Sequence, residues 1–213
     1  MKFLSARDLH PLFFLGLMLV TATAFPTSQV RRGDLATADT TSNKPVYTTS
    51  QQVGGLVTSV LKEVLEMRKE LCNGSSDCMN SDDALSENRL NLPVIQMNDG
   101  CFETGHNWEI CLLKITSGLL EYEIYLEYVK NNMQDSKKDK ARAIQTSTQA
   151  LISILRQEVK EPGKIISPGP TSTALQMETL KPQDEWLRTR ITQIILKALE
   201  EFLMDTMRST RKN

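Results

Sequence analysis

The strongest helical pattern in the chain lies in residues 108–133, WEICLLKITSGLLEYEIYLEYVKNNM. Their apolar positions recur at alternating steps of four and three residues without a break, as Trp108, Leu112, Ile115, Leu119, Tyr122, Leu126, Val129 and Met133. Because this spacing places all of them on one face of an α-helix, the stretch predicts a long helix with a coiled-coil-like seam. Trp108 heads this seam, and we expect it to lie in the core.

Three further segments show the same helical period. Apolar stripes run through residues 53–65, 141–159 (interrupted only by Thr148) and 187–202. The first helix should end near Gly74, which can supply a left-handed cap. The last helix begins after an acidic pair and ends in basic residues, which complements its dipole. No segment alternates apolar and polar residues over strand length, so the predicted fold class is all-α.

The lengths of the connections predict the topology. Only about half a dozen polar residues, centred on residues 135–139, separate the second and third helices, so these helices should be antiparallel neighbours. The other two connections have about 35 residues (72–106) and about 20 residues with several prolines and glycines. Each is long enough to cross the length of a helix. We therefore expect a long-chain four-helix bundle with up-up-down-down topology, the arrangement typical of secreted cytokine bundles.

The N-terminal segment has the features of a secretory signal peptide. Basic Lys2 and Arg7 precede an apolar run over residues 12–20, which is followed by small residues ending in Ala24. The run is about half the ~20 residues that span a bilayer, which disfavours an uncleaved anchor. We predict a leader of residues 1–24 and a secreted, extracellular product. A Ser/Thr-rich disordered tail (25–50) and the bundle domain (51–213) should follow.

Four cysteines in an exported chain indicate disulfides. Three pairings are possible, and we favour the two most local, Cys72 with Cys78 and Cys101 with Cys111. Zinc binding is disfavoured because the close pairs that a zinc site needs are missing. Asn73-Gly74-Ser75 is an N-glycosylation sequon, so Asn73 should carry a glycan.

Composition excludes several function classes. The 213 residues are 40% hydrophobic, enough for a core, and 25 basic against 26 acidic residues give a net charge of −1. We therefore expect no nucleic-acid partner and no direct membrane insertion. Two histidines and the absence of any catalytic motif predict no enzyme, no catalytic residues, no cofactor and no metal. The alternative functional classes are a secreted lipid carrier made of amphipathic helices and, less favoured, a hydrolase.

Trp186 stands out because its helical column is polar. Arg190, Gln193 and Lys197 follow it at helical spacing, away from the apolar stripe. An exposed tryptophan indicates a binding surface. The other interpretation, that Trp186 folds down over the end of the bundle, stays open at this point.

The spacing of Cys101 and Cys111, followed by Gly118-Leu119, Tyr122 and Leu126, resembles the signature of the interleukin-6 and granulocyte colony-stimulating factor family. The resemblance covers the whole mature chain, and the leader looks like that of rodent members. Further similar stretches are residues 84–88, 91–93, 99–102, 118–121 and 200–203.

This resemblance implies a monomeric secreted cytokine and growth factor without catalysis of its own. It would bind a specific, non-signalling receptor subunit first. It would then bind a shared signal-transducing subunit through two further surfaces. The expected outcome is Janus kinase and STAT signalling in inflammation, the acute-phase response and lymphocyte differentiation.

The resemblance also assigns a first surface, for the specific receptor subunit. Arg208 and Arg211 match the family's receptor-binding arginine motif at the end of the last helix, and Phe102 matches an aromatic residue of the same surface. His106 stands where the family usually has an aromatic side chain.

Two surfaces are assigned in the same way to the shared receptor subunit. Trp186 and Leu85 match the family's third surface, in agreement with the polar column of Trp186. Ser59, Glu63 and Ser147 fall at the places of the second surface, although Ser59 and Glu63 differ from the human-type residues.

Overall fold

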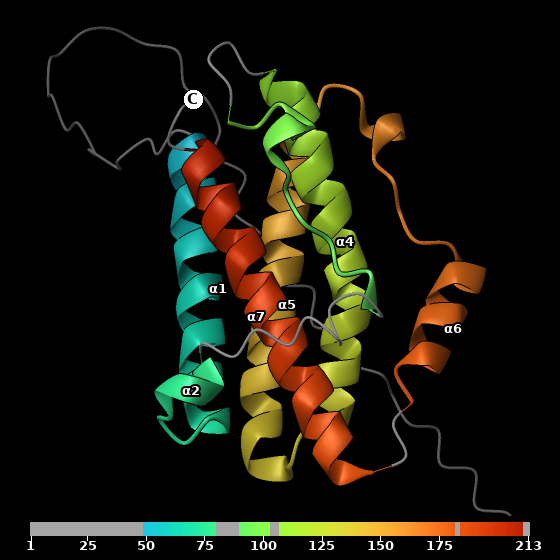
Figure 1. Ribbon diagram of the computed structural model, residues 1–213. Coiled ribbons are helices and arrows are strands. Elements are labelled where there is room, and N and C mark those ends of the chain that lie inside the picture. The colour runs from blue at the N-terminus through green and yellow to red at the C-terminus, as the bar shows by residue number, and fades with distance from the viewer. Residues whose placement is uncertain (1–48, 80–89, 103–106, 182–183, 211–213) are drawn as a thin grey trace, which may run out of the picture. The chain divides into compact units, whose positions relative to one another are not determined.

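The computed structural model describes residues 49–79, 90–102, 107–181 and 184–210, and every regular element among them is helical (Figure 1). The predicted leader and nearly all of the predicted tail lie outside these residues. Four long helices form the bundle: α1 (Thr49–Leu71), α4 (Trp108–Asn132), α5 (Asp135–Glu158) and α7 (Glu185–Thr210). The shorter elements are α2 (Ser76–Met79), η1 (Met97–Asp99), η2 (Pro162–Lys164) and α6 (Pro170–Thr179).

The order and the directions of the four long helices are as predicted. α1 packs against α5 and α7, and α4 packs against the same two helices. In Figure 1, α1 and α4 run down the view, whereas α5 and α7 run up it. The long-chain four-helix bundle with up-up-down-down topology is therefore confirmed, with long crossovers before α4 and before α7.

The predicted apolar stripes meet in one core. The valines at 53, 57, 60 and 64 of α1 are buried, as are the seam residues of α4 from Leu112 to Val129. Burying each such side chain contributes about 1.5–3 kcal/mol. The rings of Tyr122 and Phe202 meet edge to face with centroids 5.3 Å apart, which joins α4 to α7. Trp108 is only half-buried and packs against the edge of this core.

Local capping explains where the helices begin and end. Asn107 Oδ1 accepts from the backbone N–H groups of Glu109 and Ile110, at the start of α4. Asp184 Oδ1 accepts from Leu187 N at 2.7 Å, at the start of α7. At the end of α1, Gly74 has φ 73°, so the predicted left-handed glycine is confirmed.

The predicted connection between the second and third helices is wrong in its extent. Residues 135–139 form the first turn and a half of α5, since the N–H groups of Lys137 and Lys138 donate to Gln134 O. Only Met133 and Gln134 separate α4 from α5. A run of polar residues at the start of a helix has the same composition as a loop, which explains the wrong prediction. The acidic Asp135 in this first turn was a helix signal, because it complements the helix dipole.

A helix in the second crossover, α6, was not predicted. Pro170 occupies its first turn, where a missing N–H costs nothing. Its apolar residues form no regular stripe, and Leu175 is 65% exposed. Met177 and the buried Leu180 hold this segment against the core, so tertiary contacts and not periodicity determine α6.

Both predicted disulfides are present. Cys72 pairs with Cys78 and closes the end of α1 onto α2, with Cα atoms 5.5 Å apart. Cys101 pairs with Cys111 and ties the first crossover to the first turn of α4, with Cα atoms 5.0 Å apart. Each bridge therefore fixes a crossover segment to the end of a long helix.

Two tyrosines of α4 also hold the first crossover. Tyr122 donates its hydroxyl to Pro93 O at 2.9 Å, and Tyr125 donates to Leu90 O. Burial raises the pKa of Tyr125 to about 12 and the pKa of Tyr122 well above its usual value. Both hydroxyls therefore stay protonated, as donors, even near pH 10, where an exposed tyrosine ionises.

Candidate functional site

The first candidate surface is a hollow of about 510 Å³ where the first crossover meets the end of α7. Phe102 and Arg208, far apart in the sequence, line it together with Ile95, Met97 and Asp205. Two of the residues predicted for the specific receptor subunit are thus brought together. Arg211 and His106, predicted for the same surface, lie outside the described residues.

The electrostatics of this hollow centre on Arg208. Its Nη1 lies 2.8 Å from Asp205 Oδ1, one turn earlier on α7, and the two side chains are 65% and 27% exposed. An exposed pair of this kind contributes little to stability. The pair instead orients a planar guanidinium, which can bind a carboxylate of another protein through two parallel hydrogen bonds.

The crossover residues of the hollow were missed by sequence reasoning. Met97 is 74% exposed at the start of η1, a position with no helical or strand period to mark it. Asp99 holds the turn, since its Oδ2 accepts from Gln96 N at 2.7 Å and lies 3.1 Å from Lys114 Nζ on α4. Gly100, with φ 74°, ends the turn before Cys101. A Gly at this position was the one available sequence signal.

The second candidate surface is formed by α1 and α5, which lie side by side. Ser147 Oγ of α5 donates to Glu63 Oε1 of α1 at 3.3 Å. Ser59, one turn before Glu63, is exposed. All three residues predicted for this surface therefore share one face. An ion pair between Lys140 and Glu70 joins the same two helices nearer their other end.

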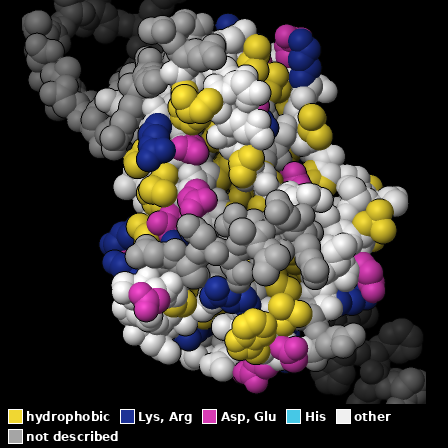
Figure 2. Space-filling view, in the orientation of Figure 1, with side chains coloured by type: hydrophobic (Ala, Val, Ile, Leu, Met, Phe, Trp, Pro, Cys, Tyr) yellow, Lys and Arg dark blue, Asp and Glu magenta, His cyan; other side chains and the backbone are white. Residues whose placement is uncertain are grey.

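The third candidate surface surrounds Trp186 in the first turn of α7. Trp186 is 73% exposed, which decides between the two interpretations in favour of an open surface. It lines a hollow of about 380 Å³ with Cys78, Thr189, Arg190 and Gln193. Figure 2 shows hydrophobic side chains next to acidic ones at the end of the bundle where α7 begins. Leu85, predicted for this surface, lies outside the described residues.

A buried arginine holds the short helix α2, which contributes Cys78 to the third surface. Arg68 of α1, 6% exposed, forms an ion pair with Glu200 of α7 and donates from Nη2 to Met79 O at 2.6 Å. It thereby fixes α2, and with it the disulfide-bonded Cys78, to both helices. Sequence reasoning missed Arg68, although a cation four residues after Val64 on an apolar stripe was a usable signal.

Two other kinds of feature, a metal site and a membrane span, are absent among the described residues. No group of His, Cys, Asp and Glu side chains there could hold a metal ion. No helix in the described ranges is long and apolar enough to cross a bilayer. Burial raises the pKa of Glu121, but this carboxyl accepts a hydrogen bond from Gln176 at 2.9 Å and so joins α6 to α4.

Comparisons with known proteins show the family of the chain. The model of the Interleukin-6/G-CSF/MGF family matches residues 26–213. Interleukin-6 from Rattus norvegicus is 72% identical and interleukin-6 from Mus musculus 69% identical, each over 212 residues and the full length of both chains. The solution structure of mouse IL-6 matches with a TM-score of 0.62 at 66% identity, covering 87% of this chain and 100% of that one. These two relatives support the predicted rodent-like form. The chain therefore belongs to the Interleukin-6/G-CSF/MGF family of cytokines, whose members signal and do not catalyse reactions.

Proposed function

We propose that the chain is a secreted, extracellular cytokine, and a glycoprotein, that acts as a monomer after removal of residues 1–24. It binds the specific interleukin-6 receptor subunit first and then the shared signal-transducing subunit. Janus kinases attached to the assembled receptors phosphorylate each other and STAT proteins. The biological outcome is the inflammatory, acute-phase and lymphocyte-differentiation response of the family.

The observation that carries this proposal is the hollow at the end of α7. Arg208 and Phe102 come from different segments, yet they line one concave surface with the exposed Met97. Interface hot spots combine arginine and aromatic anchors in this way. We assign this hollow to the specific receptor subunit.

The surfaces around Trp186 and around Ser59, Glu63 and Ser147 are assigned to the shared subunit. They lie at one end of α7 and on the α1–α5 face, so they do not overlap with the Arg208 hollow. One cytokine can therefore engage several receptor chains at once. Avidity then turns modest individual contacts into a stable assembly.

The lipid-carrier alternative needs wide apolar helix faces that open to lipid. In the described part of the chain, the stripes of all four long helices instead pack into one shared core. This packing favours the cytokine function.

The test is stepwise binding of residues 25–213 to the immobilised specific receptor ectodomain, followed by addition of the shared subunit. Arg208→Glu reverses the charge of a hot-spot anchor, so we expect a loss of at least tenfold in affinity at the first step, or about 1.4 kcal/mol or more. Trp186→Arg should leave the first step unchanged and block recruitment of the shared subunit.

Two exposed positions provide matched controls. Arg156→Glu makes the same charge reversal on α5, and Leu175→Arg places the same cation on α6. Both control proteins should bind and assemble like the wild type. If Arg208→Glu and Arg156→Glu bind the specific receptor equally well, the assignment of the Arg208 hollow is wrong.

A further inference from the structure

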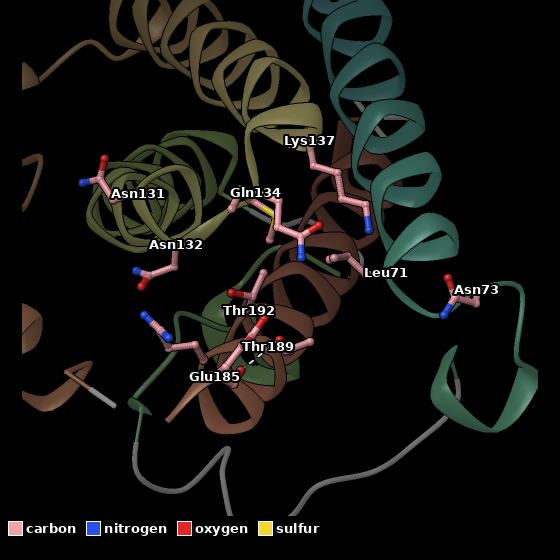
Figure 3. Close-up of a pocket in the computed structure, with 11 residues that line it drawn as sticks. Leu71, Asn73, Asn131, Asn132, Gln134, Lys137, Glu185, Thr189 and Thr192 are labelled. Carbon is pink, nitrogen blue, oxygen red and sulfur yellow. Dashed lines mark hydrogen bonds between the residues drawn. The ribbon is translucent and has the colours of Figure 1, made fainter. Parts of the chain in front are cut away.

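A second polar hollow lies at the same end of the bundle as Trp186, and its function is not explained by the receptor surfaces. Its volume is about 380 Å³, within the ~300–1,000 Å³ typical of small-ligand sites. It lies between the end of α1, the tight α4–α5 turn and the first turns of α7 (Figure 3). Asn73, the asparagine of the sequon, is one of the residues that line it.

The lining of this hollow suits a sugar. The amides of Asn131, Asn132 and Gln134 line it, and Thr192 adds a hydroxyl. Its polar lining is completed by the charged side chains of Lys137, Glu185 and Arg188. Figure 3 shows the Gln134 amide pointing into the space between Leu71 and Thr192. Amides and hydroxyls pair with sugar hydroxyls and N-acetyl groups, since both can donate and accept. The apolar Leu71 can meet the C–H face of a pyranose ring.

Two of these amides are held in place by α4 itself. Asn131 Nδ2 donates to Glu127 Oε1 and Asn132 Nδ2 donates to Tyr128 O, both at 2.9 Å. Their orientation is thus set before any ligand arrives, which lowers the entropy cost of binding. Both bonds use the amide nitrogen as donor and leave the carbonyl oxygen out of these contacts.

The position of Asn73 indicates the occupant. Asn73 is exposed, lies in the turn after α1 with φ 48°, and lines the hollow. Its neighbours Cys72 and Cys78 close this turn by a disulfide, which restricts where an attached group can go. A glycan tethered there has an effective concentration of about millimolar, so weak contacts suffice to hold it.

We propose that the first N-acetylglucosamine residues of a glycan on Asn73 sit in this hollow, on the amides of Asn131, Asn132 and Gln134. The inference rests on the proposed glycosylation of Asn73. Thr189 lines both this hollow and that of Trp186, so the seated glycan borders the third receptor surface without covering Trp186 itself.

The test compares three forms of one secreted protein: intact, trimmed by an endoglycosidase to a single N-acetylglucosamine, and freed of glycan by an amidase that leaves Asp at position 73. Mass spectrometry of the Asn73 peptide first establishes occupancy. NMR with ¹³C-labelled N-acetyl groups then follows the side-chain amides. We expect NOEs from the N-acetyl methyl group to Gln134, and shifts of the Asn131 and Asn132 amide signals on glycan removal.

The Trp108 indole signal, from the opposite end of α4, should stay unchanged. Gln134→Ala should move the N-acetyl methyl signal to its position in a free glycopeptide, whereas Gln157→Ala, an exposed site on α5, should not. An unmodified Asn73 overturns both the glycosylation and the inference. If Asn73 is modified but these NOEs and shifts are absent, the glycosylation stands and the placement of the glycan in the hollow is wrong.

Discussion

Arg68 is a buried charge that holds α2 in place next to the Trp186 hollow, although Arg68 does not line that hollow itself. Its guanidinium bridges Glu200 of α7 and the carbonyl of Met79 at the end of α2, and the side chains of Arg68 and Glu200 are 7% and 14% exposed. A buried ion pair offsets its desolvation cost only when its geometry is good, so it adds little net stability. Removing one partner of the pair is strongly destabilising, because the other charge is then left buried and unpaired.

We therefore predict that Arg68→Met lowers the free energy of unfolding by about 3 kcal/mol, since Glu200 loses its partner. Arg68→Met with Glu200→Met should recover most of this loss. Arg142→Met breaks an exposed pair with Asp139 and should cost under about 1 kcal/mol. Urea denaturation measures all three. A double variant as unstable as Arg68→Met alone would contradict the pairing argument.

At the scale of elements, α4 is the helix on which the bundle is assembled. It contacts α5, α6, α7 and the turn η1. Gly118 permits a close approach of Phe202 on α7. A Cβ atom there would lie 2.6 Å from Phe202 Cζ and 3.4 Å from Pro93 Cβ. The glycine in the family signature is thus explained by the packing of α7 against α4.

Gly118→Ala should therefore lower the free energy of unfolding by about 1–3 kcal/mol, because it overpacks the α4–α7 contact. Gly55→Ala is the matched control. Gly55 is an exposed residue inside α1 whose Cβ would meet nothing within 4 Å. Its substitution should stabilise the protein by up to about 1 kcal/mol through helix propensity. Thermal unfolding compares the two, and equal shifts of the same sign would contradict this account.

The elements that the sequence predicted are those with a continuous apolar stripe. All four long helices and the left-handed turn at Gly74 followed from periodicity and glycine chemistry. α6 did not, because Met177 and Leu180 dock on the core without forming a stripe of their own. The sequence predicts a loop in place of the first turn of α5 because residues 135–139 are all polar.

The candidate surfaces were predictable only in part, for a similar reason. Trp186 is conspicuous on a polar helix column, so periodicity alone found it. Phe102 and Arg208 needed the family resemblance, and Ile95 and Met97 were missed, because a hollow assembled from a crossover and a helix end has no local pattern. Arg68 supports its surface through contacts between α1, α2 and α7, which only the tertiary structure reveals.

At the scale of the whole molecule, the proposed function depends on keeping the proposed receptor surfaces apart on one bundle. The Arg208 hollow lies at the end of α7 and the Trp186 hollow at its start, with a core of buried side chains between them. Each surface can therefore be removed without changing the other. A cytokine that has lost only its Trp186 surface should still occupy the specific receptor and yet fail to assemble the signalling complex.

The most direct test is inhibition of STAT phosphorylation in cells that carry both receptor subunits. Trp186→Arg protein, added in excess over wild type, should suppress the signal by competing for the specific receptor. The double variant Trp186→Arg with Arg208→Glu should not suppress it, since it has lost the competing surface as well. If both variants inhibit equally, or Trp186→Arg signals like the wild type, the assignment of separate surfaces to separate receptor subunits is wrong.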